Sequence, residues 1–228
     1  MKIIATDYIQ ELAHLLVTTR VADRAGVRLS LDQGAQRAAE MLLAVRAEGR
    51  KAMVIGNGGS ASIADHLHND LTKAVGLRTL VFTQTALFTA MSNDHGYESA
   101  YQRQLAPWAE PGDLLIAISS SGASRNILSA AVAAEKAGCQ VLTLSGFAPD
   151  NALCVKGDLN FHVPSSSYGP VELAHQVLAH LFTDAAAAAL AEHQPISQQA
   201  NDGENHGVAF ETGAGDGRGG LRRRRASA

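Results

Sequence analysis

The chain has 228 residues, which is room for one domain of ordinary size and an appendage. Its residues are 46% apolar, 18% charged and 5% aromatic, as is typical of a folded globular chain. The formal net charge of −3 excludes an overall basic field that would attract nucleic acid, and no apolar run is long enough to span a membrane.

Two periodicities alternate along residues 6–192. Residues 6–24 and 31–49 space apolar side chains three and four apart, which predicts two amphipathic helices at the N-terminus. Strand-like apolar runs follow at 52–55, 80–82, 114–118, 141–144 and 159–163. Helical patterns lie between them at about 60–74, 85–105 and 124–138, with a last helix at about 170–192. Strands joined by helical crossovers predict a three-layer α/β fold with a five-stranded parallel sheet flanked by helices.

The composition changes near His193. From there to Ala228 the chain is rich in glycine and poor in aliphatic residues, so it cannot bury enough apolar area to offset its ordering entropy. We therefore expect a single domain over residues 1–192 and a disordered tail over 193–228. Four consecutive arginines, Arg222–Arg225, are typical of a contact with phosphate or membrane, although a solvated tail is the simpler interpretation.

The two cysteines, Cys139 and Cys154, lack the spacing of a metal or redox motif and are too few for a disulfide framework. Two reduced thiols fit a cytoplasmic protein. The N-terminus also lacks the basic-then-apolar pattern of a secretory signal, so we expect a cytoplasmic location.

Two of the predicted strands end in loops suited to an anion, and ligands of parallel sheets bind beyond the carboxyl ends of the strands. Residues 56–62 read GNGGSAS and open a helix, where glycines allow close backbone approach and free N–H groups face a ligand. A dinucleotide site is an alternative, although the pattern is not GxGxxG. Residues 119–124 read SSSGAS, and a helix cap needs only one serine, so four serines favour a phosphate cradle over a plain cap.

Histidines and carboxylates recur at helical spacing. His66 and Asp70 share one helix face a turn apart, and the last helix carries Glu172, His175, Gln176 and His180 on one broad face. Imidazole with carboxylate suits divalent zinc, nickel, iron or manganese, whereas a plain surface contact is the alternative for one His–Asp pair. Glu172 and His180 are separated by roughly 12 Å of helix rise. A metal shared by both would need a distorted helix start or ligands from two chains.

Together these segments resemble the sugar isomerase (SIS) domain family, and within it the phosphoheptose isomerases, which act on sedoheptulose 7-phosphate. The matching stretches are GNGGSAS at 56–62, His66 with an acid at 70, SNDHGYE at 92–98, PGDLLIAISSSGASRNIL at 111–128, GCQVLTLSG at 138–146, VPSS at 163–166 and ExxHxxxxH at 172–180. The resemblance covers about residues 30–190. It implies the five-stranded SIS fold and a homotetramer with active sites between subunits.

The resemblance also implies roles for single residues. The phosphate would lie on Ser119, Ser121 and Ser124, next to Ser120, and the sugar would be lined by Asn57, Gly58, Gly59, Ser60, Asp94 and Glu172. A divalent metal, zinc in the family, would be held by His66, Asp70, Glu172 and His180. The family usually has Glu where this chain has Asp70, and Gln where it has Glu172. Both replacements still ligate a metal, but Asp70 is one methylene shorter and Glu172 adds a negative charge.

Aldose–ketose isomerisation needs these residue types, because a carboxylate must remove a C–H proton while a second group protonates oxygen. Asp70 is the expected general base and His180 the general acid, and a divalent metal would stabilise the developing negative charge. The resemblance therefore predicts an aldose–ketose isomerase, an intramolecular oxidoreductase, that converts sedoheptulose 7-phosphate to a D-glycero-heptose 7-phosphate.

Two alternatives remain open at this point. One is an isomerase of another sugar phosphate, which a panel of five- to seven-carbon ketose phosphates would distinguish. The other is a non-catalytic SIS-domain regulator that binds a sugar phosphate or a replication initiator protein, which a metal assay would distinguish. The presence of His66, Asp70 and His180 together favours the enzyme, because a scaffold does not need all three.

Overall fold

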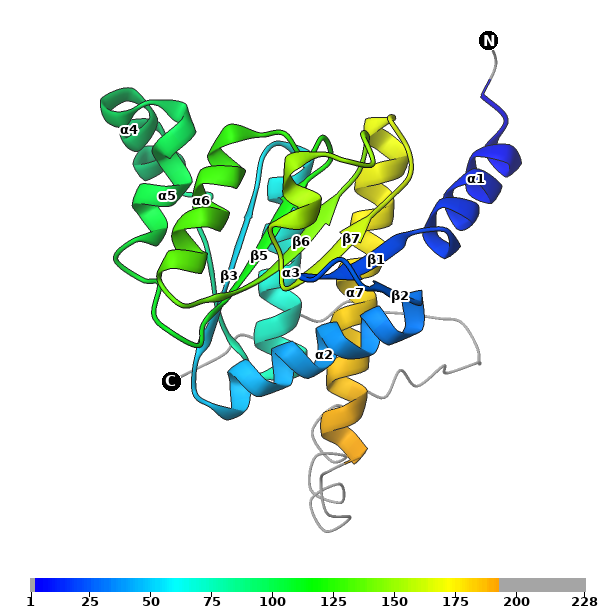
Figure 1. Cartoon of the computed structure of the whole chain (residues 1–228), viewed down its shortest axis with the longest axis horizontal. Coiled ribbons are helices and arrows are strands. Elements are labelled where there is room, and N and C mark those ends of the chain that lie inside the picture. Colours follow the sequence, from blue (N-terminus) through cyan, green and yellow to red (C-terminus); the bar gives the residue numbers. More distant parts are fainter. Residues whose placement is uncertain (1–2, 193–228) are drawn as a thin grey trace, which may run out of the picture. The chain divides into compact units, whose positions relative to one another are not determined.

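A mixed β-sheet runs through the structure, a computed structural model that describes residues 3–192 (Figure 1). The strand order is β2-β1-β7-β6-β5-β3-β4. The strands are β1 (Arg20–Asp23), β2 (Arg28–Leu29), β3 (Lys51–Gly56), β4 (Arg78–Val81), β5 (Leu114–Ser119), β6 (Gln140–Ser145) and β7 (Leu159–His162). The helices are α1 (Ala5–Val17), α2 (Leu31–Ala47), α3 (Gly59–Asp70), α4 (Thr85–His95), α5 (Ala100–Leu105), α6 (Arg125–Lys136) and α7 (Tyr168–Glu192). The tail predicted for 193–228, with its arginines, lies outside the described residues.

The five predicted strands are β3 to β7, and they pair in parallel as the α/β interpretation requires. The sheet nevertheless has seven strands, because β1 and β2 add an antiparallel hairpin to the β7 edge. The helix predicted over residues 6–24 is therefore wrong beyond Val17. Val21 is 2% exposed, and Gly26, with φ +79°, closes the hairpin. The apolar spacing of the sequence did not predict these two short strands.

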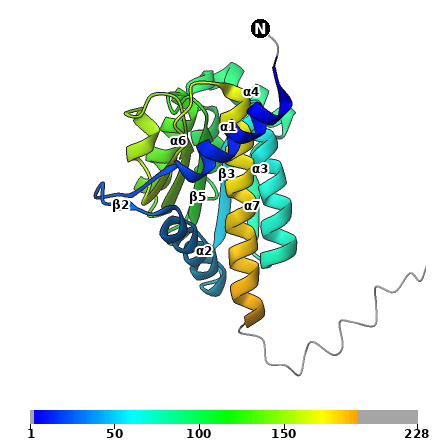
Figure 2. The same cartoon turned by 90° about the vertical axis from the view of Figure 1, so that its right-hand side faces the viewer.

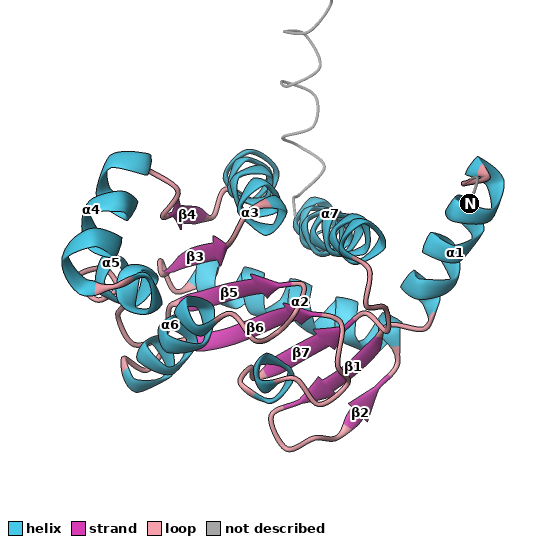
Figure 3. Ribbon diagram, turned by 90° about the horizontal axis from the view of Figure 1, so that it is seen from above, coloured by secondary structure: helices cyan, strands magenta, loops and turns pink. Residues whose placement is uncertain are grey.

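Helices cover both faces of the sheet (Figure 3). The larger core cluster packs α2, α3 and α7 on one face around Leu42, Leu67, Phe161 and Phe182. The second cluster packs α5 and α6 on the other face. Seen from the side, α3 and α7 run next to each other (Figure 2), and they are in contact along their lengths. None of the described helices is long and apolar enough to cross a membrane.

Two expectations from the sequence, one crossover helix and the state of the cysteines, differ in detail in the structure. The helix predicted over 85–105 is interrupted, because Gly96 ends α4 at φ +82° and a 3-10 turn, Tyr97–Ser99, precedes α5. Cys139 and Cys154 are both free thiols, but of the two buried thiols expected from the sequence only Cys139 is buried, and Cys154 is half-buried. Burial raises the pKa of Cys139 to about 11.

A fully buried carboxylate joins the starts of β3 and β5. Asp113 is 0% exposed and accepts hydrogen bonds from the backbone N–H groups of Lys51, at 3.0 Å, and Glu110, at 2.9 Å. The ammonium of Lys51 lies 2.7 Å from the same carboxylate. Because a buried charge without partners is expensive, this group holds the first residues of the two central strands in register.

Replacing Asp113 by Ala should lower the free energy of unfolding by roughly 3–5 kcal/mol, because it strands the Lys51 ammonium and two N–H groups. Urea unfolding at neutral pH measures this. Glu110→Ala is the matched control: that side chain is 62% exposed, so its ion pairs are worth about 1 kcal/mol at most. Equal losses in the two variants would show that Asp113 does not hold the strands.

Candidate active site

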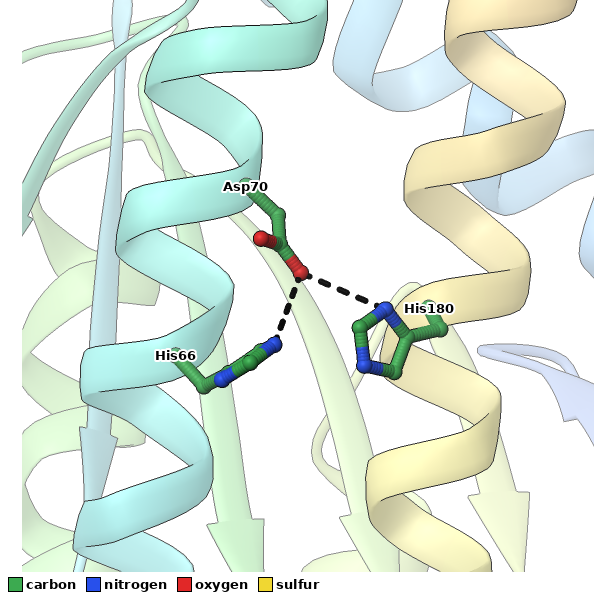
Figure 4. Close-up of side chains that lie close together, drawn as sticks. All are labelled: His66, Asp70 and His180. Atoms are coloured by element: carbon green, nitrogen blue, oxygen red, sulfur yellow. Dashed lines mark ion pairs between the residues drawn. The ribbon is translucent and has the colours of Figure 1, made fainter. Parts of the chain in front are cut away.

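Three potential metal ligands meet where α3 and α7 lie side by side (Figure 4). His66 and Asp70 are one turn apart on α3, and His180 points toward them from α7. His66 Nε2 and His180 Nδ1 each lie 3.3 Å from Asp70 Oδ2, and the two imidazole rings meet edge to face with centroids 4.8 Å apart. The structure thus brings together three of the four ligands expected from the sequence.

The donor set and its spacing fit a divalent metal. Ligand atoms at about 2.0–2.1 Å from a tetrahedral ion lie roughly 3.3–3.4 Å from one another, which matches both contacts to Asp70 Oδ2. The Asp70 side chain is 20% exposed, whereas those of His66 and His180 are 49% and 46% exposed, so one side of the group is open to a substrate. Two imidazoles and a carboxylate are ligands that zinc and related ions accept.

Asp70 is positioned by an irregular helix end. It is the last residue of α3, and a π-helical turn, Leu71–Val75, follows before Gly76 ends the segment at φ +65°. Asn69 Nδ2 donates to Asp70 Oδ1 at 3.0 Å, which leaves Oδ2 to face the imidazoles. Single π-turns are frequent at functional sites, and nothing in the apolar spacing predicted this one.

Glu172, the fourth expected metal ligand, is not part of the described group of three. It lies two turns before His180, where its carboxylate reaches Gly59 so closely that a Cβ there would be 2.3 Å from Oε2. A carboxylate at this position faces the start of α3, whose partial positive charge stabilises it. Within one chain, Glu172 therefore lies beside the serine loop and not with His66 and His180.

A cavity of about 100 Å³ opens beside the serine loop, residues 119–124. Its lining holds Asn57, Ser60, Ser119, Ser120, Ser121, Ser124, Tyr168 and Glu172. The sequence-predicted phosphate residues are therefore gathered at one place, together with Asn57, Ser60 and Glu172 from the predicted sugar-binding set. Tyr168 was not predicted from the sequence.

The serine hydroxyls are not used up by the fold. Ser124 occupies the N-cap of α6 but makes no side-chain capping hydrogen bond, so the plain-cap interpretation fails for it. Ser119 Oγ donates to Ser124 Oγ at 3.2 Å, and Ser120 Oγ is buried with no partner among the described residues. A buried hydroxyl without a partner, in the loop that leads to the N-terminus of α6, fits a polar ligand such as a phosphoryl group.

The turn of the serine loop rests on the segment after β6. Gly122 has φ +60°, and a Cβ on it would lie 1.8 Å from Asn151 Oδ1, so only glycine fits. The backbone N–H of Leu153 donates to Gly122 O at 3.0 Å. Asn151 Nδ2 donates in turn to the carbonyls of Gly146, at 2.9 Å, and Ala148, at 2.8 Å. Residues 146–153 therefore support the turn of the serine loop.

Asn57 is held by two residues that the sequence analysis did not assign to the site, Tyr97 and Asn126. The Asn57 and Asn126 amides exchange two hydrogen bonds of 2.9 Å, and the Tyr97 hydroxyl donates to Asn57 Oδ1 at 3.0 Å. Tyr97 and Asn126 lie inside the stretches that carry the family resemblance, and this resemblance is the sequence signal that could have assigned them to the site. Below them the Tyr101 hydroxyl donates to Gly56 O, and burial raises the pKa of Tyr101 to about 12.

The remaining predicted residues lie apart from the serine cavity. Gly58 is the N-cap of α3 at φ +54° and lines a second cavity, of about 220 Å³, with Tyr97 and Phe88. Asp94 is exposed near the end of α4, where its carboxylate accepts a hydrogen bond from Asn93 Nδ2 at 2.9 Å. In the described chain Asp94 lines neither cavity.

His175 anchors α7 at the end of β6. It is 0% exposed, and its Nε2 lies 3.0 Å from Ser145 O. Burial lowers the pKa of His175 from 6.5 to about 4, so the neutral ring occupies this position at neutral pH. The contact sets the height of α7 along the sheet and therefore the positions of Glu172 and His180.

The parallel sheet with polar loops at its carboxyl ends defines an α/β protein with a polar cavity at the sheet edge, and comparison with known proteins defines it further. The sequence pattern of the SIS domain matches residues 19–146. A phosphoheptose isomerase of Syntrophotalea carbinolica is 34% identical over 184 residues, which cover 78% of this chain and 89% of that protein. The chain belongs to the SIS-domain family.

Solved structures of phosphoheptose isomerases are similar to this chain. A phosphoheptose isomerase of Neisseria gonorrhoeae superposes with a TM-score of 0.66 at 26% identity, covering 80% of this chain and 92% of that one. That of Francisella tularensis superposes with a TM-score of 0.67 at 24% identity, covering 80% and 96%, and shows the shared fold. The resemblance stated from the motifs is confirmed.

The buried His175 predicts an acid-sensitive fold. A histidine whose folded pKa is about 4 and whose unfolded pKa is about 6.5 stabilises the fold above pH 6.5 and loses that contribution as the pH falls toward 4. Between pH 7.5 and 4.5 this amounts to roughly 2–3 kcal/mol. Urea unfolding at both values should show a smaller pH dependence for His175→Gln than for wild type. The exposed control His14→Gln should behave as wild type, and an unchanged pH dependence in His175→Gln would refute the assignment.

Proposed function

We propose that this chain is an aldose–ketose isomerase acting on a sugar phosphate, with sedoheptulose 7-phosphate as substrate and a D-glycero-heptose 7-phosphate as product. The observation that carries the proposal is the meeting of one carboxylate, Asp70, with two imidazoles, His66 and His180, on the same pair of helices that borders the serine cradle. The named activity of the relatives supports it.

Substrate binding would begin at the serine loop. The hydroxyls of Ser119, Ser121 and Ser124 and the start of α6 take the phosphate, far from the carbons that react. Glu172, at the other wall of this cavity, accepts hydrogen bonds from sugar hydroxyls. Anchoring one end of the sugar in this way orients its other end toward Asp70 on α3 and His180, which lies roughly 12 Å beyond Glu172 along α7.

The proton transfers would use Asp70 and His180. Asp70 Oδ2 takes the proton from the hydroxyl-bearing carbon beside the carbonyl and returns it to the former carbonyl carbon. His180 gives a proton to the carbonyl oxygen and receives one from the neighbouring hydroxyl, so protons balance over the cycle. His180 Nδ1 lies 3.3 Å from Asp70 Oδ2, so the two side chains are close enough to act on adjacent atoms of one substrate.

We propose that His66, Asp70 and His180 hold a divalent metal, which is zinc by the resemblance to the family. When bound, it supplies positive charge against the negative charge that develops on the substrate oxygens. Asp70 keeps its orientation in either case through Asn69. The half-exposed imidazoles leave room for the substrate on the solvent side of the group.

We further propose that the chain assembles as a homotetramer. On α7 a stripe of large apolar side chains faces solvent: Leu173 is 43% exposed, Val177 43% and Leu181 38%. On α1, Ile9 and Val17 are 64% and 71% exposed. Apolar stripes at helical spacing on two neighbouring helices fit helix-to-helix contacts between copies. Because Glu172 and His180 lie on α7 as well, such contacts would border the active site.

Replacing Asp70 by Asn should reduce turnover of sedoheptulose 7-phosphate by about 10²–10⁴-fold, the usual contribution of a positioned general base. Product formation by NMR measures this, and metal content per chain is determined on the same samples. Asp65→Asn on the same helix is the matched control and should keep full activity. Full activity in Asp70→Asn, in protein that holds no divalent metal, would overturn the enzymatic proposal in favour of a regulator that only binds sugar phosphate.

The double variant Ser121→Ala, Ser124→Ala should raise KM strongly at nearly unchanged kcat, because each lost hydrogen bond to a charged group is worth roughly 1.5–3 kcal/mol. Initial rates over a range of substrate concentrations give both constants. Ser129→Ala, on α6 beyond the cradle, serves as the control. A KM equal to that of wild type would mean that the phosphate binds elsewhere.

A further inference from the structure

A cavity of about 220 Å³ lies outside the candidate active site, at the β1–β2 edge of the sheet. It lies between the hairpin, the end of β7 and the segment that follows β6. The residues used below from its lining are Arg20, Arg24, Arg28, Pro149, Val155 and His162. Asp23 also lines the cavity, and its carboxylate accepts the Val27 N–H at 2.9 Å and lies 3.9 Å from Arg37. None of these residues takes part in the proposed reaction.

The strand register explains why basic side chains gather there. Arg20 is paired with His162 across β1 and β7, and Ala22 is paired with Arg28 across β1 and β2. Directly paired residues share a face of a sheet, and side chains alternate along a strand. Arg20, Arg28 and His162 therefore project from one face, while Val21 is buried on the other face in the core around α2.

Two of the three arginines have no anionic partner among the described residues. Arg24 is neutralised, because it lies 2.8 Å from Asp158 Oδ1 and 2.5 Å from Glu135 Oε1. Arg20 and Arg28 make no ion pair within the described chain. Burial, and then the nearby charge of Arg20, lower the pKa of His162, so this side chain adds no charge of its own at neutral pH.

The same cavity contains unmet hydrogen-bonding capacity. His162 is 5% exposed, and its Nε2 donates to Ala148 O at 3.2 Å, so its buried Nδ1, which has no partner in the described structure, is an acceptor that a water or a ligand hydroxyl can satisfy. A buried polar atom without a partner costs about 1–3 kcal/mol unless a water or ligand reaches it. Pro149 and Val155, which is 70% exposed, add an apolar wall beside the basic one.

We propose that this cavity is a second ligand site, which binds the oxyanion of a small metabolite. Two guanidinium groups without partners present paired N–H donors that match phosphate or carboxylate oxygens. The cavity volume corresponds to roughly seven waters at about 30 Å³ each, which is enough for a small organic anion whose carbon part lies on Pro149 and Val155.

The position of the site connects it to the serine cradle. Pro149 and Val155 belong to the segment that wraps Asn151 and Leu153 against Gly122. An anion in the cavity therefore contacts the outer side of the support whose inner side holds the phosphate loop. Phe147, in the same segment, has φ +58°, a conformation that non-glycine residues rarely adopt.

Calorimetric titration of the full chain with inorganic phosphate tests the proposal. The Ser121→Ala, Ser124→Ala background weakens the cradle, so that the second site is measured by itself. In this background we expect phosphate binding that weakens at least tenfold when Arg20→Ala and Arg28→Ala are added, and a parallel titration with succinate tells phosphate from carboxylate preference. Arg103→Ala, an exposed arginine on α5, is the control and should change nothing.

Hydrogen exchange locates the bound anion. Phosphate should slow amide exchange in residues 20–28 and 149–155 of the cradle-weakened protein, and the two arginine replacements should remove that protection while leaving thermal unfolding near that of the parent. Binding of neither anion, or equal affinity with and without the two arginines, overturns the proposal. Protection confined to residues 119–127 does so as well, because it would mean that the remaining cradle accounts for the binding.

Discussion

The packing of α3 against α7 is the constraint on which the site depends. Each helix buries one face on the sheet, and the contact between them brings residues distant in sequence within hydrogen-bonding range. Gly59 is essential to the close approach, since a side chain there would collide with the carboxylate of Glu172. The buried contact of His175 with Ser145 sets the height of α7, so that His180 lies opposite Asp70.

This arrangement separates two groups of polar side chains along α3 and α7. Near the start of α3, a carboxylate and a group of hydroxyls share a small cavity. About three turns further along α3, a second carboxylate lies between two imidazoles. Phosphate binding and proton transfer need opposite surroundings, since one needs donors for an anion and the other a base that is free to accept a proton. Helix length provides the separation without any additional element.

The hairpin of β1 and β2 adds two antiparallel strands to the β7 edge of the sheet. It covers the last parallel strand, whose edge would otherwise present unpaired backbone groups. It also places Arg20 and Arg28 over the segment after β6, and that segment supports Gly122 in the serine loop. The edge of the sheet and the candidate active site are therefore linked through one short stretch of chain.

The sequence by itself determined the local features: five parallel strands, the two loops at their carboxyl ends, and the His66–Asp70 pair at one helical turn. Periodicity and loop composition encode such features because they depend on neighbours within a few residues. Only the tertiary structure decided that residues 20–29 form a hairpin, that Glu172 lies at Gly59 and not with the histidines, and that Tyr97 and Asn126 hold Asn57. These depend on which surfaces bury one another across 30 to 140 residues of sequence, and burial at that range outweighs local propensity.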